Sequence, residues 1–499
     1  MPDQLLQDVF LLAPEVALTV TFLVAIIVDL VFRRTSLPVA AVVMTGLVVT
    51  GFLVVAQTGV EESVFSNMIA VDPFAFFFKL VIVLSAILVV IFSLWSGELQ
   101  SNQARLGEYY SLLPALTLGM MLMAGASNLL MMYLAVELSS IASYILTGYT
   151  KEAPDSSEAS LKYVIYGAMS SGLMLYGFSI IYGLTGSLDL YAINRVLAEG
   201  ATSGLALLIG GLLAMAGLGY KISAVPFHFW TPDVYEGAPI TITAFLSVAS
   251  KAGGFALMIR FFKVTFIDTS VMRLPEGVWA SLPGFDWFHV VAALSVLTMT
   301  LGNLVAIWQN NMKRLLAYSS IAHAGYMLMG VVVLSNDGVS AVMIYFVVYL
   351  FMNLGAFGIV MLIANKIGSE DIEDYKGLGA RMPFMAVALA FFLISLTGLP
   401  PTAGFIGKLY LFAALINHDW VWLAIVGALN SVVSLYYYVR VLRNMFLRQG
   451  DIAAPQPIVY DVLQTATILV LLVPTVLFGL YPVPLVELAQ ASVRIFGTP

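Results

Sequence analysis

Long apolar runs dominate this sequence and restrict the folds it can adopt. About 20 consecutive apolar residues cross a bilayer as a helix, and such runs recur along most of the 499 residues. We therefore predict an all-α polytopic membrane protein with about fourteen transmembrane helices. The predicted helices lie near 9–32, 37–57, 73–95, 109–125, 128–149, 158–184, 203–229, 238–264, 287–308, 313–334, 340–366, 382–417, 419–447 and 460–481.

The composition agrees with a chain that lies within lipid. Hydrophobic residues make up 61% of the sequence and charged residues 10%, whereas soluble domains carry about 25% charged residues. The lack of cysteine excludes disulfides, thiolate metal sites and cysteine-ligated iron–sulfur clusters. The longest stretch between runs, near 265–286, is too short for a soluble domain. The expected surroundings are the lipid bilayer and partner proteins, not nucleic acid.

The basic residues other than the five lysines expected within the membrane, Lys79, Lys162, Lys221, Lys251 and Lys408, predict the orientation of the chain. If the N-terminus lies outside, twelve of them face inward and five face outward, and inner loops are the ones that collect Lys and Arg. An even number of helices then returns the C-terminus to the outside. The inner set is Arg33, Arg34, Arg105, Lys151, Lys313, Arg314, Lys366, Lys376, Arg381, Arg440, Arg443 and Arg448, and the outer set is Arg195, Arg260, Lys263, Arg273 and Arg494.

Proline interrupts two of the predicted helices. Pro226 lies in the seventh, and the pair Pro400 and Pro401 lies in the twelfth. Proline removes a helical hydrogen bond, and the freed carbonyls are tolerated at membrane depth only beside protein or a water-filled cavity. Each break lies close to a lysine, Lys221 and Lys408 respectively. Because paired discontinuous helices mark transport sites, we expect such a site here.

The two breaks divide the chain into corresponding parts. Helices four to eight and nine to thirteen form two blocks of five, and the broken helix is fourth in both. Because five is odd, the second block starts from the opposite side, so we predict inverted repeats. The correspondence is incomplete, since the thirteenth helix has no equivalent of Lys251. The predicted units are the first three helices at 1–108, the first repeat at 109–265, the second repeat at 287–448 and the last helix at 449–499.

Several lysines lie inside the apolar runs. A charge at the bilayer centre costs about 2.5–3.5 kcal/mol on insertion scales, so such lysines need partners or a use. We expect Lys79, which is near a helix end, to snorkel to the membrane surface. Lys162 follows Glu158 by four residues, the favourable order for an ion pair, and a simple pair at the helix start is one interpretation. The full set is Lys79, Lys162, Lys221, Lys251 and Lys408.

Further titratable groups are expected at the same depth. Glu137 lies roughly 14 Å into its helix at 1.5 Å per residue, too deep for a carboxylate to reach the surface. It either supports a neighbouring helix or is the counter-charge of Lys221, because an opposite charge favours the ammonium and burial favours the amine. His323 is either a hydrogen-bonded core histidine or a proton relay. With Lys251 and Lys408, these residues predict a proton wire with a gate, not a substrate pocket.

Several stretches carry a family resemblance: KISAVPFHFWTPDVYEGAP, KRLLAYSSIAHAGYML, DYKGLGARMP and LTGLPPTAGFIGKLYLF. They resemble the proton-conducting, antiporter-like membrane subunits of respiratory complex I, which are related to subunits of multisubunit sodium/proton antiporters. The resemblance covers nearly the whole chain. The early segments APEVALTVTFLVAIIVDL and SSEASLKY, together with a lysine at position 408 where related subunits usually carry glutamate, are similar to the subunit N branch.

The resemblance implies roles for individual residues. Glu137 and Lys221 would form a gating ion pair, and Lys251 would connect the two halves. His323 would relay protons between the halves, and Lys408 would face the outer exit.

The resemblance also implies how the chain works with others. Lys162 would modulate the first half. Such subunits hold no redox cofactor and bind no NADH, so hydride and electron chemistry is expected in other subunits of an NADH:quinone oxidoreductase. The expected partners are a neighbouring antiporter-like subunit and small membrane subunits, in a bacterial inner (plasma) membrane.

Two other functions are open at this point. A subunit of a sodium/proton antiporter would work without redox input. A structural spacer would explain the apolar composition, but not the cost of Lys221, Lys251 and Lys408 at membrane depth, about 7–10 kcal/mol together.

Overall fold

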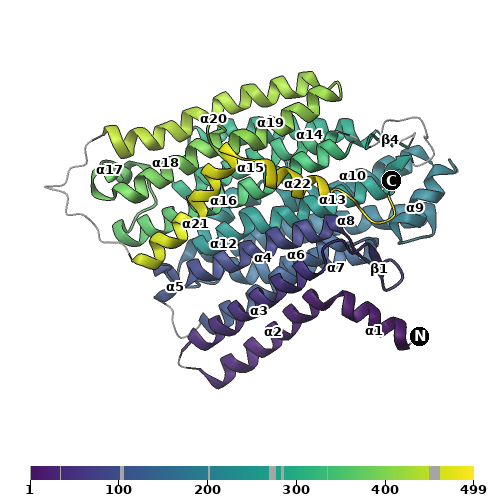
Figure 1. Ribbon diagram of the computed structural model, residues 1–499, viewed down its shortest axis with the longest axis horizontal. Coiled ribbons are helices and arrows are strands. Elements are labelled where there is room, and N and C mark those ends of the chain that lie inside the picture. Colours follow the sequence, from purple (N-terminus) through teal and green to yellow (C-terminus); the bar gives the residue numbers. More distant parts are fainter. Residues whose placement is uncertain are drawn as a thin grey trace.

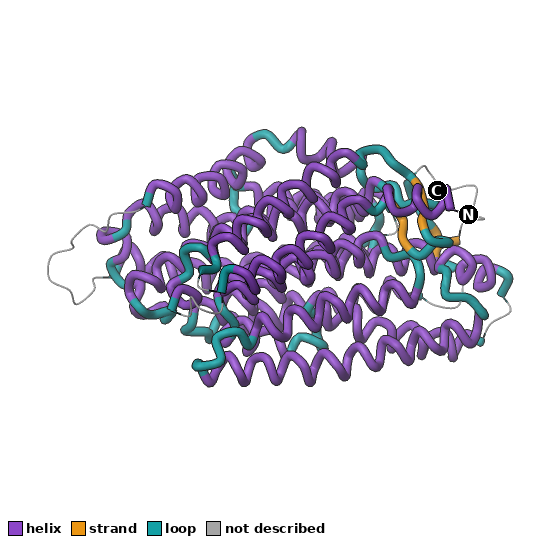
Figure 2. Tube along the Cα trace, turned by 90° about the horizontal axis from the view of Figure 1, so that it is seen from below, coloured by secondary structure: helices purple, strands orange, loops and turns teal. Residues whose placement is uncertain are grey.

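Helices make up most of the described chain and run along the long axis of the computed structural model (Figure 1). The N- and C-termini lie at the same end of the bundle, and the strands lie there as well (Figure 2). We call this the termini end, and the opposite end, which carries α5 and α17, the far end. The structure describes residues 2–33, 35–101, 106–200, 203–268, 277–282, 286–333, 335–448 and 461–498.

The first half of the chain contains most of the short elements. Its long helices are α2 (Ala13–Val31), α3 (Leu37–Ala56), α4 (Pro73–Ser93), α6 (Leu106–Gly125), α7 (Leu129–Thr147), α8 (Pro154–Thr185), α10 (Gly204–Ile222) and α13 (Lys251–Phe266). Its short elements are α1 (Pro2–Leu11), β1 (Glu62–Val64), β2 (Ile69–Val71), α5 (Gly97–Gln100), α9 (Leu190–Ala198), α11 (Trp230–Gly237), α12 (Ile240–Phe245), the π-helical turn η2 (Leu246–Ser250) and β3 (Ile267–Asp268). Strands β1 and β2 pair antiparallel, with Ser63 opposite Ala70.

The second half consists mainly of long helices. They are α14 (Trp287–Ala306), α15 (Met312–Val332), α16 (Asn336–Ile367), α18 (Pro383–Thr397), α19 (Ala403–Asn417), α20 (Val421–Leu447) and α21 (Val462–Leu480). The short elements are β4 (Ala280–Ser281), which pairs with β3, the 3₁₀ turn η3 (Ile372–Tyr375), α17 (Leu378–Arg381) and α22 (Val483–Ala491).

The expected membrane helices are confirmed. Within the described residues, twelve helical segments are long and apolar enough to cross a bilayer. The predicted fourth helix corresponds to α6, and the predicted twelfth helix corresponds to α18 and α19 together. The loop expected at 265–286 falls largely outside the described residues. The short helices α1, α9 and α22 were not predicted, because each is too short to give a membrane-length apolar run.

Both predicted helix breaks are present. The seventh helix ends with α10 at Ile222, and the chain becomes helical again only at α11. The twelfth ends with α18 at Thr397 and resumes at Ala403. Each break contains a cis peptide bond before proline, at Pro226 and Pro401. The eighth helix holds an interruption that was not predicted, the turn η2 between α12 and Lys251.

The helices around Lys251 form the centre of the bundle. The most apolar stretch of Ile240–Phe266 is 100% buried, and that of α15 is 94% buried, whereas α2 and α21 are only 28% and 22% buried. The peripheral helices present large apolar side chains outward, among them Phe52 and Val432. Such a surface suits lipid tails or partner helices and leaves the polar chemistry to the central helices.

The expectation that Lys79 snorkels was wrong. Lys79 is 1% exposed, and its Nζ lies 2.7 Å from Oε1 of Glu15 on α2. Glu15 is itself only 4% exposed. The lysine is stabilised by a carboxylate from another helix, which removes the reason to reach the surface. This pair links α2 to α4.

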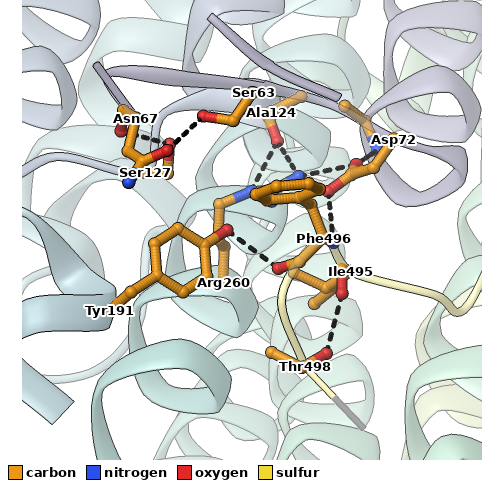
Figure 3. A network of polar contacts seen from close by, with 11 residues as sticks. Ser63, Asn67, Asp72, Ala124, Ser127, Tyr191, Arg260, Ile495, Phe496 and Thr498 are labelled. Atoms are coloured by element: carbon orange, nitrogen blue, oxygen red, sulfur yellow. Dashed lines mark hydrogen bonds and ion pairs between the residues drawn. The ribbon is translucent and has the colours of Figure 1, made fainter. Parts of the chain in front are cut away.

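A second buried ion pair fixes the C-terminal segment at the termini end (Figure 3). Arg260 on α13 donates to both carboxylate oxygens of Asp72 over 2.8 and 2.9 Å, and to the carbonyl of Ala124. Asp72 caps α4 and also accepts the backbone N–H of Phe496. Tyr191 donates to the carbonyl of Phe496. Arg260, counted among the outward loop residues in the sequence, is fully buried, because Asp72 neutralises it.

Candidate functional site

A row of buried basic side chains crosses the middle of the bundle. Lys221 and Lys251 are each 1% exposed, His323 is 2% exposed and Lys408 is 3% exposed. They come from four helices, α10, α13, α15 and α19. None of these groups extends to the surface, so snorkelling does not explain them. We call these four residues the basic row.

Lys221 begins the row in the last turn of α10, directly before the break. Its Nζ donates to Oγ of Ser140 on α7 over 3.2 Å. Glu137 lies one turn earlier on α7 and interacts electrostatically with Lys221, but the two make no ion pair within 4.0 Å. One carboxylate oxygen of Glu137 is buried without a hydrogen-bond partner among the described residues. The expected gating pair is therefore close but not in contact.

Lys251 is the second member of the row and directly follows the turn η2. Its Nζ donates to the carbonyl oxygen of Ser320 over 2.7 Å and to Oγ of the same residue over 2.6 Å. A π-helical turn inside an α-helix often marks a functional site. Gly254, one turn further on, lets the side chain of Lys221 approach, since an added Cβ would lie 3.3 Å from Cγ of that lysine. This close approach brings the first two lysines to the same part of α13.

His323 lies between Lys251 and Lys408 and interacts electrostatically with both. Its Nδ1 is 2.7 Å from the hydroxyl of Tyr345, and its Nε2 is 3.4 Å from the hydroxyl of Tyr438. Both ring nitrogens thus have a hydroxyl partner that can donate or accept. Such an arrangement lets the ring accept a proton at one nitrogen from one hydroxyl and release a proton from the other nitrogen to the second hydroxyl.

Lys408 ends the row at the second break. Its Nζ donates to the carbonyl of Thr397 over 2.8 Å and to Ser431 over 2.9 Å, and it lies 4.4 Å from the ring centre of Tyr326. Thr397 is the last residue of α18, so the ammonium meets the negative end of a half-helix. Gly398 is in the left-handed region, at φ +87°, and a Cβ there would lie 2.8 Å from Cδ of Lys408. The glycine is needed both for the turn and for the lysine.

Lys162 lies outside the basic row. Its side chain is 37% exposed and pairs with Glu158 at 2.7 Å and with Asp233 of α11 at 2.5 Å. Asp233 also pairs with Arg314 at 2.7 Å. The i,i+4 pair at the helix start is present, and the structure adds a link from α8 across α11 to α15 that the sequence did not predict.

Hydroxyl and amide groups between the basic residues were not predicted. Tyr349 and Asn353 continue the spacing of four from Tyr345 along one face of α16, and Asn353 donates to Ser247 over 2.6 Å. The hydroxyls of Tyr235 and Tyr349 and the carbonyl oxygen of the Asn353 amide are buried without a hydrogen-bond partner among the described residues. Buried polar atoms of this kind are the ones that internal water satisfies. The spacing of four in the sequence was the available signal.

Within the described residues, no group of three or more His, Asp or Glu side chains could hold a metal ion. His228 is 4% exposed at the first break, and its Nδ1 has no hydrogen-bond partner among the described residues. The chemistry that this site offers is proton transfer between amines, an imidazole and hydroxyls.

The transmembrane family described as NADH:quinone oxidoreductase/Mrp antiporter matches residues 126–434. The chain belongs to this family. Every member of the basic row, as well as Glu137 and Lys162, lies within the matched residues, so the matched region spans the whole candidate site.

Relatives and solved structures agree with the family. The NADH-quinone oxidoreductase subunit N 2 of Chloroherpeton thalassium is 50% identical over 97% of this chain and 94% of its own length. A chain of respiratory complex I from Thermus thermophilus is 29% identical, with a TM-score of 0.78 over 96% of this chain and 99% of that one. A chain of the Mrp complex from Dietzia sp. has a TM-score of 0.81 over 96% of both chains at 20% identity, which shows the shared fold alone.

Proposed function

We propose that this chain is a proton-translocating membrane subunit of an NADH:quinone oxidoreductase, and that protons move along the basic row. The observation that carries the proposal is the row itself, four bases at most 3% exposed that lie beside two broken helices. A structural spacer would not need these groups, because burying each charge in the membrane costs free energy and would serve no function. The similarity to an NADH-quinone oxidoreductase subunit N 2 and to a chain of respiratory complex I supports the proposal.

The contacts suggest how the row would transfer protons. A neutral amine can accept a proton and an ammonium can release one, and burial or a nearby carboxylate decides which form is favoured. Movement of Glu137 toward Lys221 would therefore favour uptake of a proton by that lysine, and movement away would favour its release. Lys251 would receive the proton, Ser320 and His323 would carry it onward, and Lys408 would hold it at the second break. Lys162 would tune the first half through Asp233.

We further propose that no redox cofactor is bound here and that electron transfer takes place in partner subunits. The chain would be coupled to those subunits through conformational or electrostatic change. The two blocks at 109–265 and 287–448 are proposed to be inverted repeats, which would give each half its own broken helix.

Replacement of Lys221 or Lys408 with methionine tests the proposed function. Methionine fills similar volume without charge, so the complex should still assemble. The protons translocated per NADH oxidised, measured in vesicles by dye quenching, are expected to fall in both variants. Full translocation in both assembled variants would contradict the proposal. Sodium/proton exchange by the unmodified chain without NADH or quinone would instead favour the alternative function, a subunit of a sodium/proton antiporter.

We also propose that the termini end faces the outside of a bacterial inner membrane and the far end faces the cytoplasm. The chain has no cysteine, so single introduced cysteines report the side cleanly. Lys151→Cys at the far end is expected to react with a membrane-impermeant thiol reagent in inside-out vesicles only. Thr58→Cys at the termini end should react in right-side-out vesicles only. The reverse pattern would overturn this orientation.

A further inference from the structure

A polar cavity of about 490 Å³ lies at the far end of the bundle, apart from the basic row. The loop around α5, the start of α12, the start of α15 and the end of α16 surround it, and Gly97 and Asp371 are exposed at its rim. Its lining includes the carboxylates of Glu98 and Glu370. A cavity this large and this polar can hold several waters.

Charged groups are held at fixed positions in this cavity. Nζ of Lys313, which is 5% exposed, lies 3.1 Å from Oε1 of Glu370 and donates to the carbonyl of Ala238. Glu98 takes no part in that ion pair. Its Oε2 instead accepts the N–H of Ile240, the first residue of α12, over 3.3 Å. Glu98 is thus a carboxylate in the cavity at the start of the helix that leads to Lys251.

Polar side chains continue from this point toward Lys251 through an otherwise apolar segment. The hydroxyls of Tyr109 and Thr241 lie 2.8 Å apart, and Tyr109 interacts electrostatically with Glu98. Thr243, Ser247 and Lys251 then follow at intervals of four, which places them along one side of the helix.

Near Lys251, these polar side chains contact the face of α16 that carries Tyr345, Tyr349 and Asn353. Ser247 accepts the amide of Asn353, whose own carbonyl oxygen is buried and unpartnered among the described residues, as is the hydroxyl of Ser250. Between the cavity and Lys251 there are therefore polar atoms at each turn, with free hydrogen-bonding capacity for internal water.

We propose that this cavity is a second proton-uptake site, in which Glu98 takes protons from cavity water and passes them to Lys251 without passing Lys221. The inference rests on the proposed function and adds to it Glu98 as a second source of protons for Lys251. At each step a proton moves from one oxygen to the next, and the last step converts the neutral amine of Lys251 to the ammonium. Lys221 and Glu98 would then be two parallel sources for one common acceptor.

The electrostatic surroundings of Glu98 suit this role. Burial and the neighbouring carboxylate of Glu370 raise the pKa of Glu98, while Lys313 opposes that rise. A carboxyl group whose pKa lies closer to neutrality can both accept and release a proton. The neighbouring carboxylate, Glu370, is already engaged in the ion pair with Lys313.

Replacement Glu98→Gln tests the proposal in the assembled complex. The amide can still accept the N–H of Ile240, so the packing of α12 is retained, but it cannot carry a proton. The number of protons that pass through this chain per NADH oxidised is expected to fall severalfold. Formate, a small weak acid, should restore part of this translocation. Glu373→Gln, at an exposed carboxylate of the same end that does not line the cavity, should have no effect.

Combined variants separate this proposal from the proposed function. Two parallel sources predict that Glu98→Gln with Lys221→Met loses more translocation than either change alone, and that Glu98→Gln adds nothing to Lys251→Met. If Lys251→Met abolishes the chain's share and Glu98→Gln has no effect, the uptake site is wrong while the proposed function stands. If Glu98→Gln lowers translocation but formate does not restore it, the role of Glu98 is structural and the uptake site is again wrong. If Lys251→Met itself has no effect, the proposed function fails first.

Discussion

Replacement of Lys251 with methionine is expected to remove this chain's entire share of the protons translocated per NADH. Lys251 lies at the centre of the bundle. The side chain of Lys221 packs against Gly254, one turn away from Lys251, and Nζ of Lys251 donates to Ser320. Removing a positioned proton-transfer group typically costs about 10²–10⁴-fold in rate, so the flux through the row should fall below detection. Proton uptake by vesicles, measured together with NADH oxidation, gives the ratio.

The order of the row makes a sharper form of this prediction. If protons pass through Lys251 in series with Lys408, the double variant Lys251→Met with Lys408→Met should lose no more translocation than Lys251→Met alone. Ser320→Ala removes only one of the two acceptors of Lys251, because the backbone carbonyl remains, so it should retain part of the flux. A Lys251→Met complex that assembles and translocates normally would contradict the transfer along the row.

The sequence was sufficient to predict the membrane helices, the two breaks and the buried lysines. Each of these features depends on local sequence: an apolar run of membrane length, a proline inside it, or a charge far from either end. For the same reason the predicted positions of α3, α14 and α20 agree with the structure to within about two residues, the usual uncertainty of helix ends.

The partners of the charged residues could not be predicted, because they come from distant parts of the chain. Lys79 was expected at the surface, and nothing near it in the sequence indicates that Glu15 lies opposite. Likewise, Ser320 is 69 residues away from Lys251. The turn η2 was missed because Leu246–Ser250 contains no proline or glycine to mark it.

The cavity at the far end depends on the same kind of long-range contact. Glu98 meets Ile240 across 142 residues, and an isolated glutamate in a short loop carries no local signal of burial. In contrast, the spacing of Tyr345, Tyr349 and Asn353 by four was present in the sequence and could have indicated a polar face on α16.

Replacement of Arg260 with methionine is expected to have the largest effect on stability. Arg260 and Asp72 are both fully buried, so the change would leave an uncompensated carboxylate in the interior. Removing one partner of a buried pair typically costs about 3–5 kcal/mol. The same change loosens the cap of α4 and the attachment of Phe496, since both depend on the position of Asp72. On heating, we expect the variant chain to dissociate from the purified complex at a lower temperature than the unmodified chain.

A double variant separates the buried charge from the lost contacts. Asparagine at position 72 can still cap α4 and accept the N–H of Phe496, but it carries no charge, so Asp72→Asn with Arg260→Met should be more stable than Arg260→Met alone. Lys376→Met, which breaks a pair whose side chains are 34% and 60% exposed, should change stability by less than about 1 kcal/mol. Equal destabilisation by Arg260→Met and Lys376→Met would show that the buried pair does not hold the C-terminal segment, because only an interior charge makes the first change costly.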